Sequence, residues 1–176
     1  MRSFWIYFAA GSALIIWFSW TVSIRARRFH GVARFFAFES ILALFLLNVS
    51  VWFQDPWSAL HVLSWILLAG SIFLAAGSIS RYLKFAAPQG QFENSTHLIE
   101  TGIYRFIRHP MYGSLMLLGL GIFFKRVTTL TSALAFVVVL ALGLTALIEE
   151  GEMRTRFGED YAAYKRRTRM FVPFLL

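Results

Sequence analysis

The chain has 176 residues, of which 58% are hydrophobic, 18% aromatic and only 15% charged, with a formal net charge of +8. A soluble domain carries about 25% charged residues, so this composition is typical of an integral membrane protein with one compact domain. The absence of cysteine excludes disulfide bonds, thiolate metal ligands and a cysteine nucleophile. Positive residues gather beside apolar segments, which indicates membrane topology and no nucleic-acid partner.

Five apolar segments predict five transmembrane helices, over residues 3–24, 35–53, 57–80, 111–124 and 127–148. Four of them are close to the roughly 20 residues that a span requires. The fourth has 14 residues and rises only about 21 Å. We expect it to begin earlier, at Pro110, because proline fits the first turn of a helix, where its missing N–H costs nothing.

After the last span, residues 149–168 have the pattern of an amphipathic helix. Apolar and aromatic side chains recur at intervals of four, four and three, in the order Met153, Phe157, Tyr161 and Tyr164. These intervals form one stripe of a helix, and basic residues cover the rest. We therefore expect a helix on the membrane surface, with Gly158 capping or breaking it.

The predicted fold class is all-α, an integral membrane bundle of five transmembrane helices with a cytoplasmic C-terminal interfacial helix. Residues 1–86 hold the first three helices, and residues 87–176 hold a cytoplasmic loop, a helical hairpin and the C-terminal helix. With five spans, 14 of the 17 Lys and Arg residues lie on one side, which should be the cytoplasm. The N-terminus is then outside and the C-terminus inside a bacterial or archaeal cytoplasmic membrane.

Two polar clusters flank the hairpin of the last two spans. Arg108, His109 and Tyr112 precede it, and Glu149 and Glu150 follow it. Folding of the hairpin brings both clusters to the cytoplasmic face. Adjacent side chains point about 100° apart on a helix, so we expect only one of the two carboxylates to face a ligand.

Three motifs follow one another in the second half of the chain: Arg108-His109-Pro110-x-Tyr112, Glu149-Glu150 and Phe157-Gly158-x-x-Tyr161-x-x-Tyr164. With Pro173 after them, they resemble the isoprenylcysteine carboxyl methyltransferase family of integral membrane enzymes. Phospholipid N-methyltransferases, more distant relatives of that family, have a similar glutamate pair. The resemblance covers roughly residues 95–173.

This resemblance implies a methyltransferase that uses S-adenosyl-L-methionine and a lipidic or amphiphilic substrate entering sideways from the membrane lipid. It places the cofactor between the last two spans and the C-terminal segment, without a metal ion. The cofactor-binding residues that it implies are His109, Tyr112, Glu149, Glu150, Tyr161 and Tyr164. Their chemistry suits this cofactor, because carboxylates favour its ammonium group and ribose hydroxyls, and aromatic faces favour a sulfonium cation.

The methyl acceptor stays open between two classes. Carboxyl methylation of a prenylcysteine-like compound, which the nearest resemblance implies, needs a cation beside the substrate carboxylate, and Arg108, Arg166 or Arg167 could provide it. N-methylation of an aminophospholipid needs a path for the ammonium proton, and Glu39 or Glu150 could assist. In either reaction, alignment of donor and acceptor is the main catalytic resource.

Structural explanations compete with these roles. Arg108 could anchor lipid headgroups, His109 could cap a helix, Tyr112 could be an interfacial aromatic, and the glutamates could form a solvated helix end. A non-enzymatic haem carrier or transporter subunit is a further alternative. Haem would favour two histidines at matched depth, whereas His61 is expected near the outer surface and the other three on the cytoplasmic side. The sequence does not predict an oligomeric state.

Overall fold

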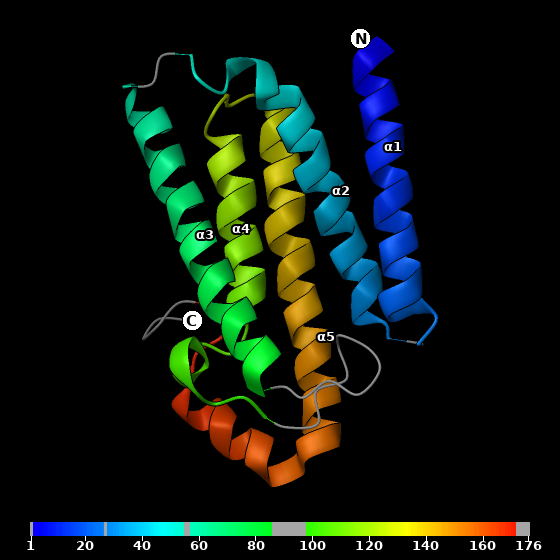
Figure 1. Cartoon of the computed structure of the whole chain (residues 1–176), viewed down its shortest axis with the longest axis vertical. Helices are drawn as coiled ribbons and strands as arrows, with labels where there is room; N and C mark the ends of the chain where they lie inside the picture. Colours follow the sequence, from blue (N-terminus) through cyan, green and yellow to red (C-terminus); the bar gives the residue numbers. More distant parts are fainter. Residues whose placement is uncertain (1, 27, 55–56, 86–97, 172–176) are drawn as a thin grey trace.

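The structure, a computed structural model, describes residues 2–26, 28–54, 57–85 and 98–171. Within these ranges it is helical, without a strand, and Figure 1 shows the helices side by side in one bundle. Four helices are long and apolar enough to cross a membrane, and a fifth apolar helix is shorter. The predicted all-α membrane bundle is therefore confirmed, with four to five helices of spanning character.

The first two helices form a hairpin at one edge of the bundle. α1 spans Arg2–Ser19 and continues as one turn of π-helix, η1, at Trp20–Ile24; α2 spans His30–Asn48 and ends in the 3-10 turn η2, Val49–Val51. The turn between α1 and α2 is tight, because a Cβ atom on Gly31 would lie 2.2 Å from the Cβ atom of Ser23. Glycine at this position therefore holds Ser23 against the first turn of α2.

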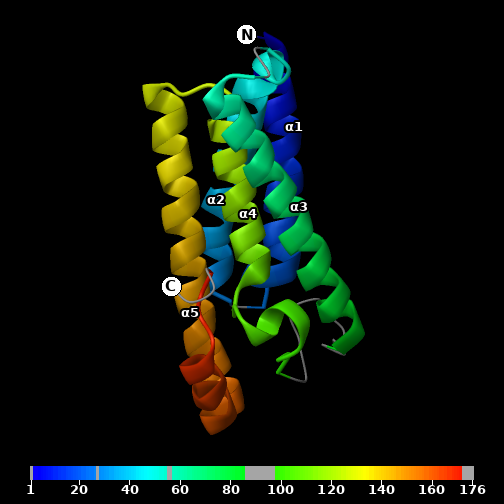
Figure 2. The ribbon, with the colours of Figure 1, turned by 90° about the vertical axis from the view of Figure 1, so that its left-hand side faces the viewer.

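α4 is the short central helix. It spans Pro110–Phe123, with Pro110 in its first turn as predicted, and lies between α3, Ala59–Phe85, and α5 in both views (Figures 1 and 2). Two buried side chains bind carbonyl oxygens at its C-terminal end. Asn48 donates from Nδ2 to the Ile122 oxygen at 2.9 Å, and Ser64 donates from Oγ to the Gly121 oxygen at 2.6 Å. These bonds join α2 and α3 to the last turn of α4, where carbonyl oxygens run out of partners within the helix.

α5 is the longest helix, with 39 residues over Thr129–Arg167. It begins at a capping box of Thr128 and Thr131 and bends at Gly158, where φ is 54° and ψ is −125°. The sequence predicted a separate helix from residue 149, but the helix continues through that point and breaks only at Gly158. Figure 1 shows the part after the bend turning across the end of the bundle.

The loop between α1 and α2, the 3-10 helix η3 at Gly102–Arg105, and the part of α5 after Gly158 lie at the same end of the bundle (Figure 1). We call this the site end. Some sequence predictions fall outside the described residues: the boundary between residues 86 and 87, most of the loop that follows it, His97 and Pro173.

Candidate functional site

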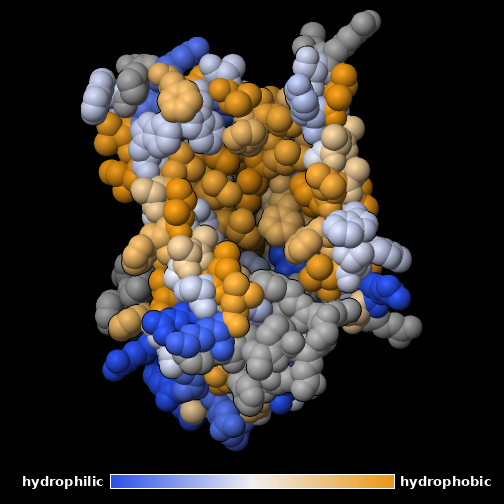
Figure 3. All heavy atoms as spheres, in the orientation of Figure 1, coloured by the Kyte–Doolittle hydropathy of each residue, from blue (hydrophilic) through white to orange (hydrophobic). Residues whose placement is uncertain are grey.

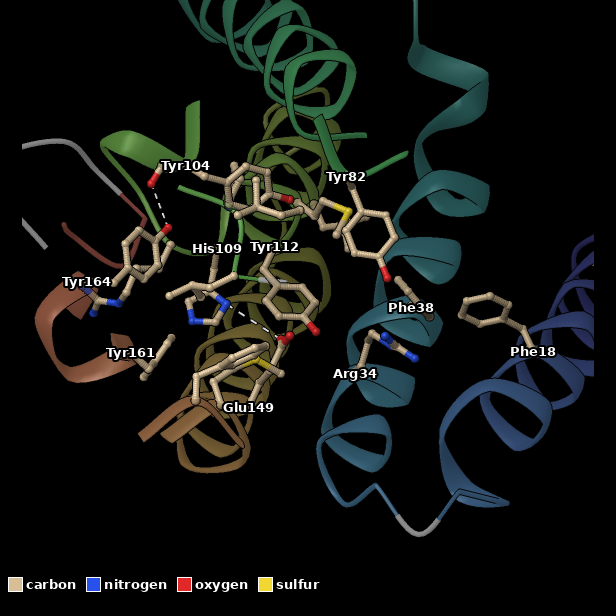
Figure 4. Close-up of a pocket in the computed structure, with 18 residues that line it drawn as sticks. Phe18, Arg34, Phe38, Tyr82, Tyr104, His109, Tyr112, Glu149, Tyr161 and Tyr164 are labelled. Atoms are coloured by element: carbon tan, nitrogen blue, oxygen red, sulfur yellow. Dashed lines mark hydrogen bonds and ion pairs between the residues drawn. The ribbon is translucent and has the colours of Figure 1, made fainter. Parts of the chain in front are cut away.

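A cavity of about 240 Å³ lies at the site end, and its lining includes residues from α1 to α5 and from the segment before α4. Figure 4 shows tyrosines, His109 and Glu149 on one side and Arg34 with two phenylalanines on the other. Six of the predicted site residues line it: Arg108, His109, Tyr112, Glu149, Tyr161 and Tyr164. Met153 and Phe157, the other members of the predicted stripe, line it too.

Glu150 does not line the cavity, and its side chain, 4% exposed, is held by two cations. Arg108 donates from Nε to its Oε1 at 2.6 Å, and Lys165 binds its Oε2. Burial raises the pKa of the Glu150 carboxyl, but His109, Lys165 and Arg108 outweigh that effect and lower the pKa to about 2. Glu150 is therefore an ionised anchor between the segment before α4 and the end of α5.

Glu149 is the carboxylate on the cavity wall, and its side chain is 26% exposed. The two glutamates thus point to different sides of α5, as the angle between adjacent helical residues predicts. His109 lies between them, with Nδ1 3.8 Å from Oε2 of Glu149 and Nε2 3.6 Å from Oε1 of Glu150. The His109 ring stacks on Tyr112, with centroids 5.7 Å apart.

The backbone around His109 is fixed by the C-terminal tail. The amide N–H of Arg108 donates to the Arg169 oxygen at 2.8 Å, and the amide N–H of His109 donates to the Met170 oxygen at 3.1 Å. Arg108 also donates from its guanidinium to the Thr168 oxygen at 2.6 Å. The tail therefore fixes the backbone that positions Arg108 and His109 at the cavity.

Tyrosines form much of the cavity wall. Tyr164 donates from its hydroxyl to the backbone oxygen of Tyr104 at 2.7 Å, which joins the end of α5 to η3. The hydroxyls of Tyr104 and Tyr161 are buried and have no hydrogen-bond partner among the described residues. Burial, reinforced by the Glu149 carboxylate, raises the pKa of Tyr104 above its ordinary value, so its hydroxyl remains a neutral donor. A buried hydroxyl without a partner is costly, and a polar ligand would remove that cost.

Four predicted site residues lie elsewhere. Glu39 accepts a hydrogen bond from Ser12 Oγ at 2.6 Å, between α1 and α2. Arg166 is exposed, and Arg167, also exposed, pairs with Glu100. None of these three lines the cavity; the fourth is Glu150.

Sequence reasoning assigned no site role to the residues that α1, α2 and α3 contribute: Phe18, Arg34, Phe38 and Tyr82. Arg34 was counted among the charges that orient the bundle. Its position one turn before Phe38, at the start of an apolar segment, was an available signal, but many membrane proteins place arginine there for topology alone.

A family model described as phospholipid methyltransferase matches residues 59–160, which is more than half of the chain. The chain belongs to the phospholipid methyltransferase family. It is therefore a membrane methyltransferase that acts on lipid. No curated protein matches it.

The match to the phospholipid methyltransferase family divides the cavity wall in two. His109, Tyr112 and Glu149 lie inside the matched range, whereas Tyr161 and Tyr164 follow it. The residues from α1 and α2 precede it. The wall that α1 and α2 provide therefore lies outside the matched segment.

Proposed function

We propose that this protein transfers methyl groups from S-adenosyl-L-methionine to the amine of an aminophospholipid. The observation that carries the proposal is the cavity in which Glu149 lies with His109 and a wall of tyrosines, in a chain of the phospholipid methyltransferase family. When bound, the cofactor would supply a methyl group from its sulfonium. The acceptor ammonium would first lose a proton to solvent; the lone pair of the neutral amine would then form the carbon–nitrogen bond, and the carbon–sulfur bonding electrons would return to sulfur.

The residues present fit this cofactor. The Glu149 carboxylate can bind an ammonium group or ribose hydroxyls, and the faces of Tyr112, Tyr161 and Tyr164 suit adenine and a sulfonium cation. The hydroxyls of Tyr104 and Tyr161, which have no hydrogen-bond partner within the described part of the chain, offer donors that a polar ligand can satisfy. Closure of the cavity by the end of α5 would exclude water and strengthen the electrostatic contacts to a cation.

The charged side chains around the cavity favour an amine as the methyl acceptor over a carboxylate. Carboxyl methylation of a prenylcysteine was the leading expectation from the sequence, which assigned the substrate carboxylate to Arg108, Arg166 or Arg167. Arg108 is engaged by Glu150 and the Thr168 oxygen, and Arg166 and Arg167 do not line the cavity. The Glu149 carboxylate would attract an ammonium group and repel a carboxylate.

The surface supports access from lipid. α2 packs along α5 and α3 packs along α4, and Figure 3 shows this face hollowed between α3 and α1, with hydrophobic residues lining the hollow. Phe18 of α1 and Tyr82 of α3, from the two helices that border the hollow, also line the cavity. A lipid could therefore place its headgroup in the cavity while its acyl chains stay in the hydrophobic hollow.

The proposal is tested by cofactor binding to the detergent-purified full chain, measured by calorimetry with S-adenosylhomocysteine. Glu149→Gln keeps the shape of the side chain and removes its charge, so one charge-assisted hydrogen bond is lost. Affinity should fall roughly ten- to a hundredfold. His109→Ala should also weaken binding, whereas His61→Ala at the other end of the bundle should not.

Glu159→Gln is the matched control, because Glu159 is an exposed glutamate of α5 that does not line the cavity. Equal affinity for S-adenosylhomocysteine in the wild type and Glu149→Gln, with the same melting temperature, would contradict the role of Glu149. If the wild type does not bind S-adenosylhomocysteine at all, the proposal that the protein uses S-adenosyl-L-methionine is contradicted.

A further inference from the structure

The two walls of the cavity carry opposite charge. Glu149 enters from α5 beside His109, whereas Arg34 enters from α2 on the opposite side in the view of Figure 4. Arg108 also lines the cavity, on the wall of His109, where it binds Glu150 and the Thr168 oxygen. A ligand pair that consists of a cationic cofactor and an anionic lipid headgroup would match this separation, with the anion at Arg34.

Arg34 is buried, with 7% of its surface exposed, and neighbouring groups hold it in a fixed orientation. Its guanidinium donates from Nη2 to Ser23 Oγ at 2.6 Å and lies over the rings of Phe18 and Phe38, at 5.5 and 5.8 Å from their centroids. Gly31 keeps Ser23 close, as described above. A guanidinium oriented in this way loses little conformational entropy when it binds an anion.

We propose that Arg34 binds the phosphate group of the acceptor lipid and determines specificity for phosphate-bearing acceptors. This inference rests on the proposed function and names the part of the acceptor that the α2 wall recognises. Planar guanidinium groups bind phosphate oxygens through two parallel hydrogen bonds. A buried arginine beside aromatic rings makes such a bond without competition from water.

The position of Arg34 favours an anion that is not itself methylated. A carboxylate neutralised by a guanidinium donates its lone pair less readily, so pairing with Arg34 would slow its own methylation. In phosphoethanolamine the phosphate and the amine are separated by two carbon atoms. Phosphate bound at Arg34 therefore leaves the amine free to point across the cavity toward Glu149, where the proposed function places the cofactor.

The test measures lipid binding directly, without cofactor. Lyso-phosphatidylethanolamine is titrated into the detergent-purified full chain, and a long-chain alkylamine without phosphate and a farnesylated cysteine are titrated in parallel. Arg34→Gln should weaken binding of the phospholipid roughly ten- to a hundredfold, the value of one charge-assisted hydrogen bond. The alkylamine and the farnesylated cysteine should each change less than threefold.

Two further variants make the result specific. Arg34→Lys keeps the positive charge but loses the planar guanidinium, so it should weaken phospholipid binding by a smaller factor. If Arg34→Gln does not fold, Arg34→Lys is used for the test in its place. Arg126→Gln is the matched control, because Arg126 is an exposed arginine at the other end of α4. It should change none of the three affinities.

Equal losses for phospholipid and alkylamine, or no loss for the phospholipid, would overturn the inference. A loss confined to the farnesylated cysteine would overturn it as well, and would assign the anion site to a carboxylate. Failure of the proposed function has a different signature. In that case S-adenosylhomocysteine does not bind, while phospholipid binding still depends on Arg34.

Discussion

Arg108 donates from Nε to Oε1 of Glu150 at 2.6 Å, across 42 residues of the chain. This bond joins the segment before α4 to the interior of α5, and Lys165 binds the same carboxylate from beyond the bend at Gly158. Two adjacent glutamates therefore have different roles. Glu150 stabilises the walls of the cavity, and Glu149 faces its interior.

Glu150→Gln should therefore destabilise the protein, because Arg108 would be left with its buried charge uncompensated. Removal of one partner from a buried ion pair costs about 3 kcal/mol. The melting temperature of the detergent-purified protein at pH 7 should fall clearly for Glu150→Gln and little for Glu149→Gln. The reverse order would show that the two glutamates have exchanged roles.

The stabilisation by Glu150 should disappear in acid. Its pKa is lowered from 4.5 to about 2 in the folded protein. A group with a lowered folded pKa contributes its stabilisation above its unfolded pKa and loses it as the pH falls through the folded pKa. The difference in melting temperature between the wild type and Glu150→Gln should thus stay constant above about pH 4.5 and shrink as the pH approaches 2. A difference that persists unchanged at pH 2 would exclude the charge as its cause.

Gly158→Ala should weaken the site through the backbone alone. No atom lies within 4 Å of a Cβ at this position, but φ is 54° with ψ at −125°, a region that is essentially restricted to glycine. The substitution should cost about 1–3 kcal/mol and displace Tyr161 and Tyr164, so both melting temperature and cofactor affinity should fall. Gly151→Ala is the control, since Gly151 is exposed within regular helix and has equal space; it should be neutral or slightly stabilising.

The orientation in the membrane can be tested with single cysteines, because the natural chain has none. Gln54→Cys lies at the end opposite to the cavity, and Glu159→Cys lies in the exposed part of α5 after the bend. A membrane-impermeant maleimide applied to intact cells should label the first and not the second. Labelling of Glu159→Cys in intact cells would place the site outside the cytoplasm.

Acceptors should require an apolar chain, because the cavity is bordered by the hydrophobic hollow between α3 and α1 (Figure 3). Binding energy from remote parts of a substrate positions the reacting group. Phosphoethanolamine without acyl chains should therefore give no measurable turnover in a radiolabelled methyl-transfer assay, while its lysophospholipid is methylated. Equal turnover of both would contradict access from the lipid.

The membrane bundle and much of the cavity wall could be predicted from sequence because lipid imposes long apolar segments, and the polar residues that remain at their ends are few. The start of α4 at Pro110 and the presence of His109, Tyr112 and Glu149 on one face follow from that logic. The intervals between Met153 and Tyr164 identified one stripe, which the sequence analysis assigned to the membrane surface, whereas its four residues line the cavity.

Arg34 and Tyr82 could not be assigned in the same way, because the rotation of a helix about its own axis is set by packing against neighbours. Hydropathy is nearly uniform around such helices and does not record this rotation. The sequence predicted a helix boundary at residue 149 in addition to the break at Gly158, and only the break at Gly158 is present. Charged residues from Glu149 onward indicate where the membrane ends, whereas α5 bends only at Gly158, which adopts a conformation that other residues avoid.

The short central helix has a consequence for the bilayer. α4 has 14 residues and is about 21 Å long, whereas the hydrocarbon core is about 30 Å thick. At least one end of α4 is then set inward from the headgroup plane, and a bilayer meets a short span by thinning around it. The thickness of the host membrane should therefore affect how easily a lipid reaches the cavity, since a thinner leaflet brings each headgroup closer to the depth of Glu149 and Arg34.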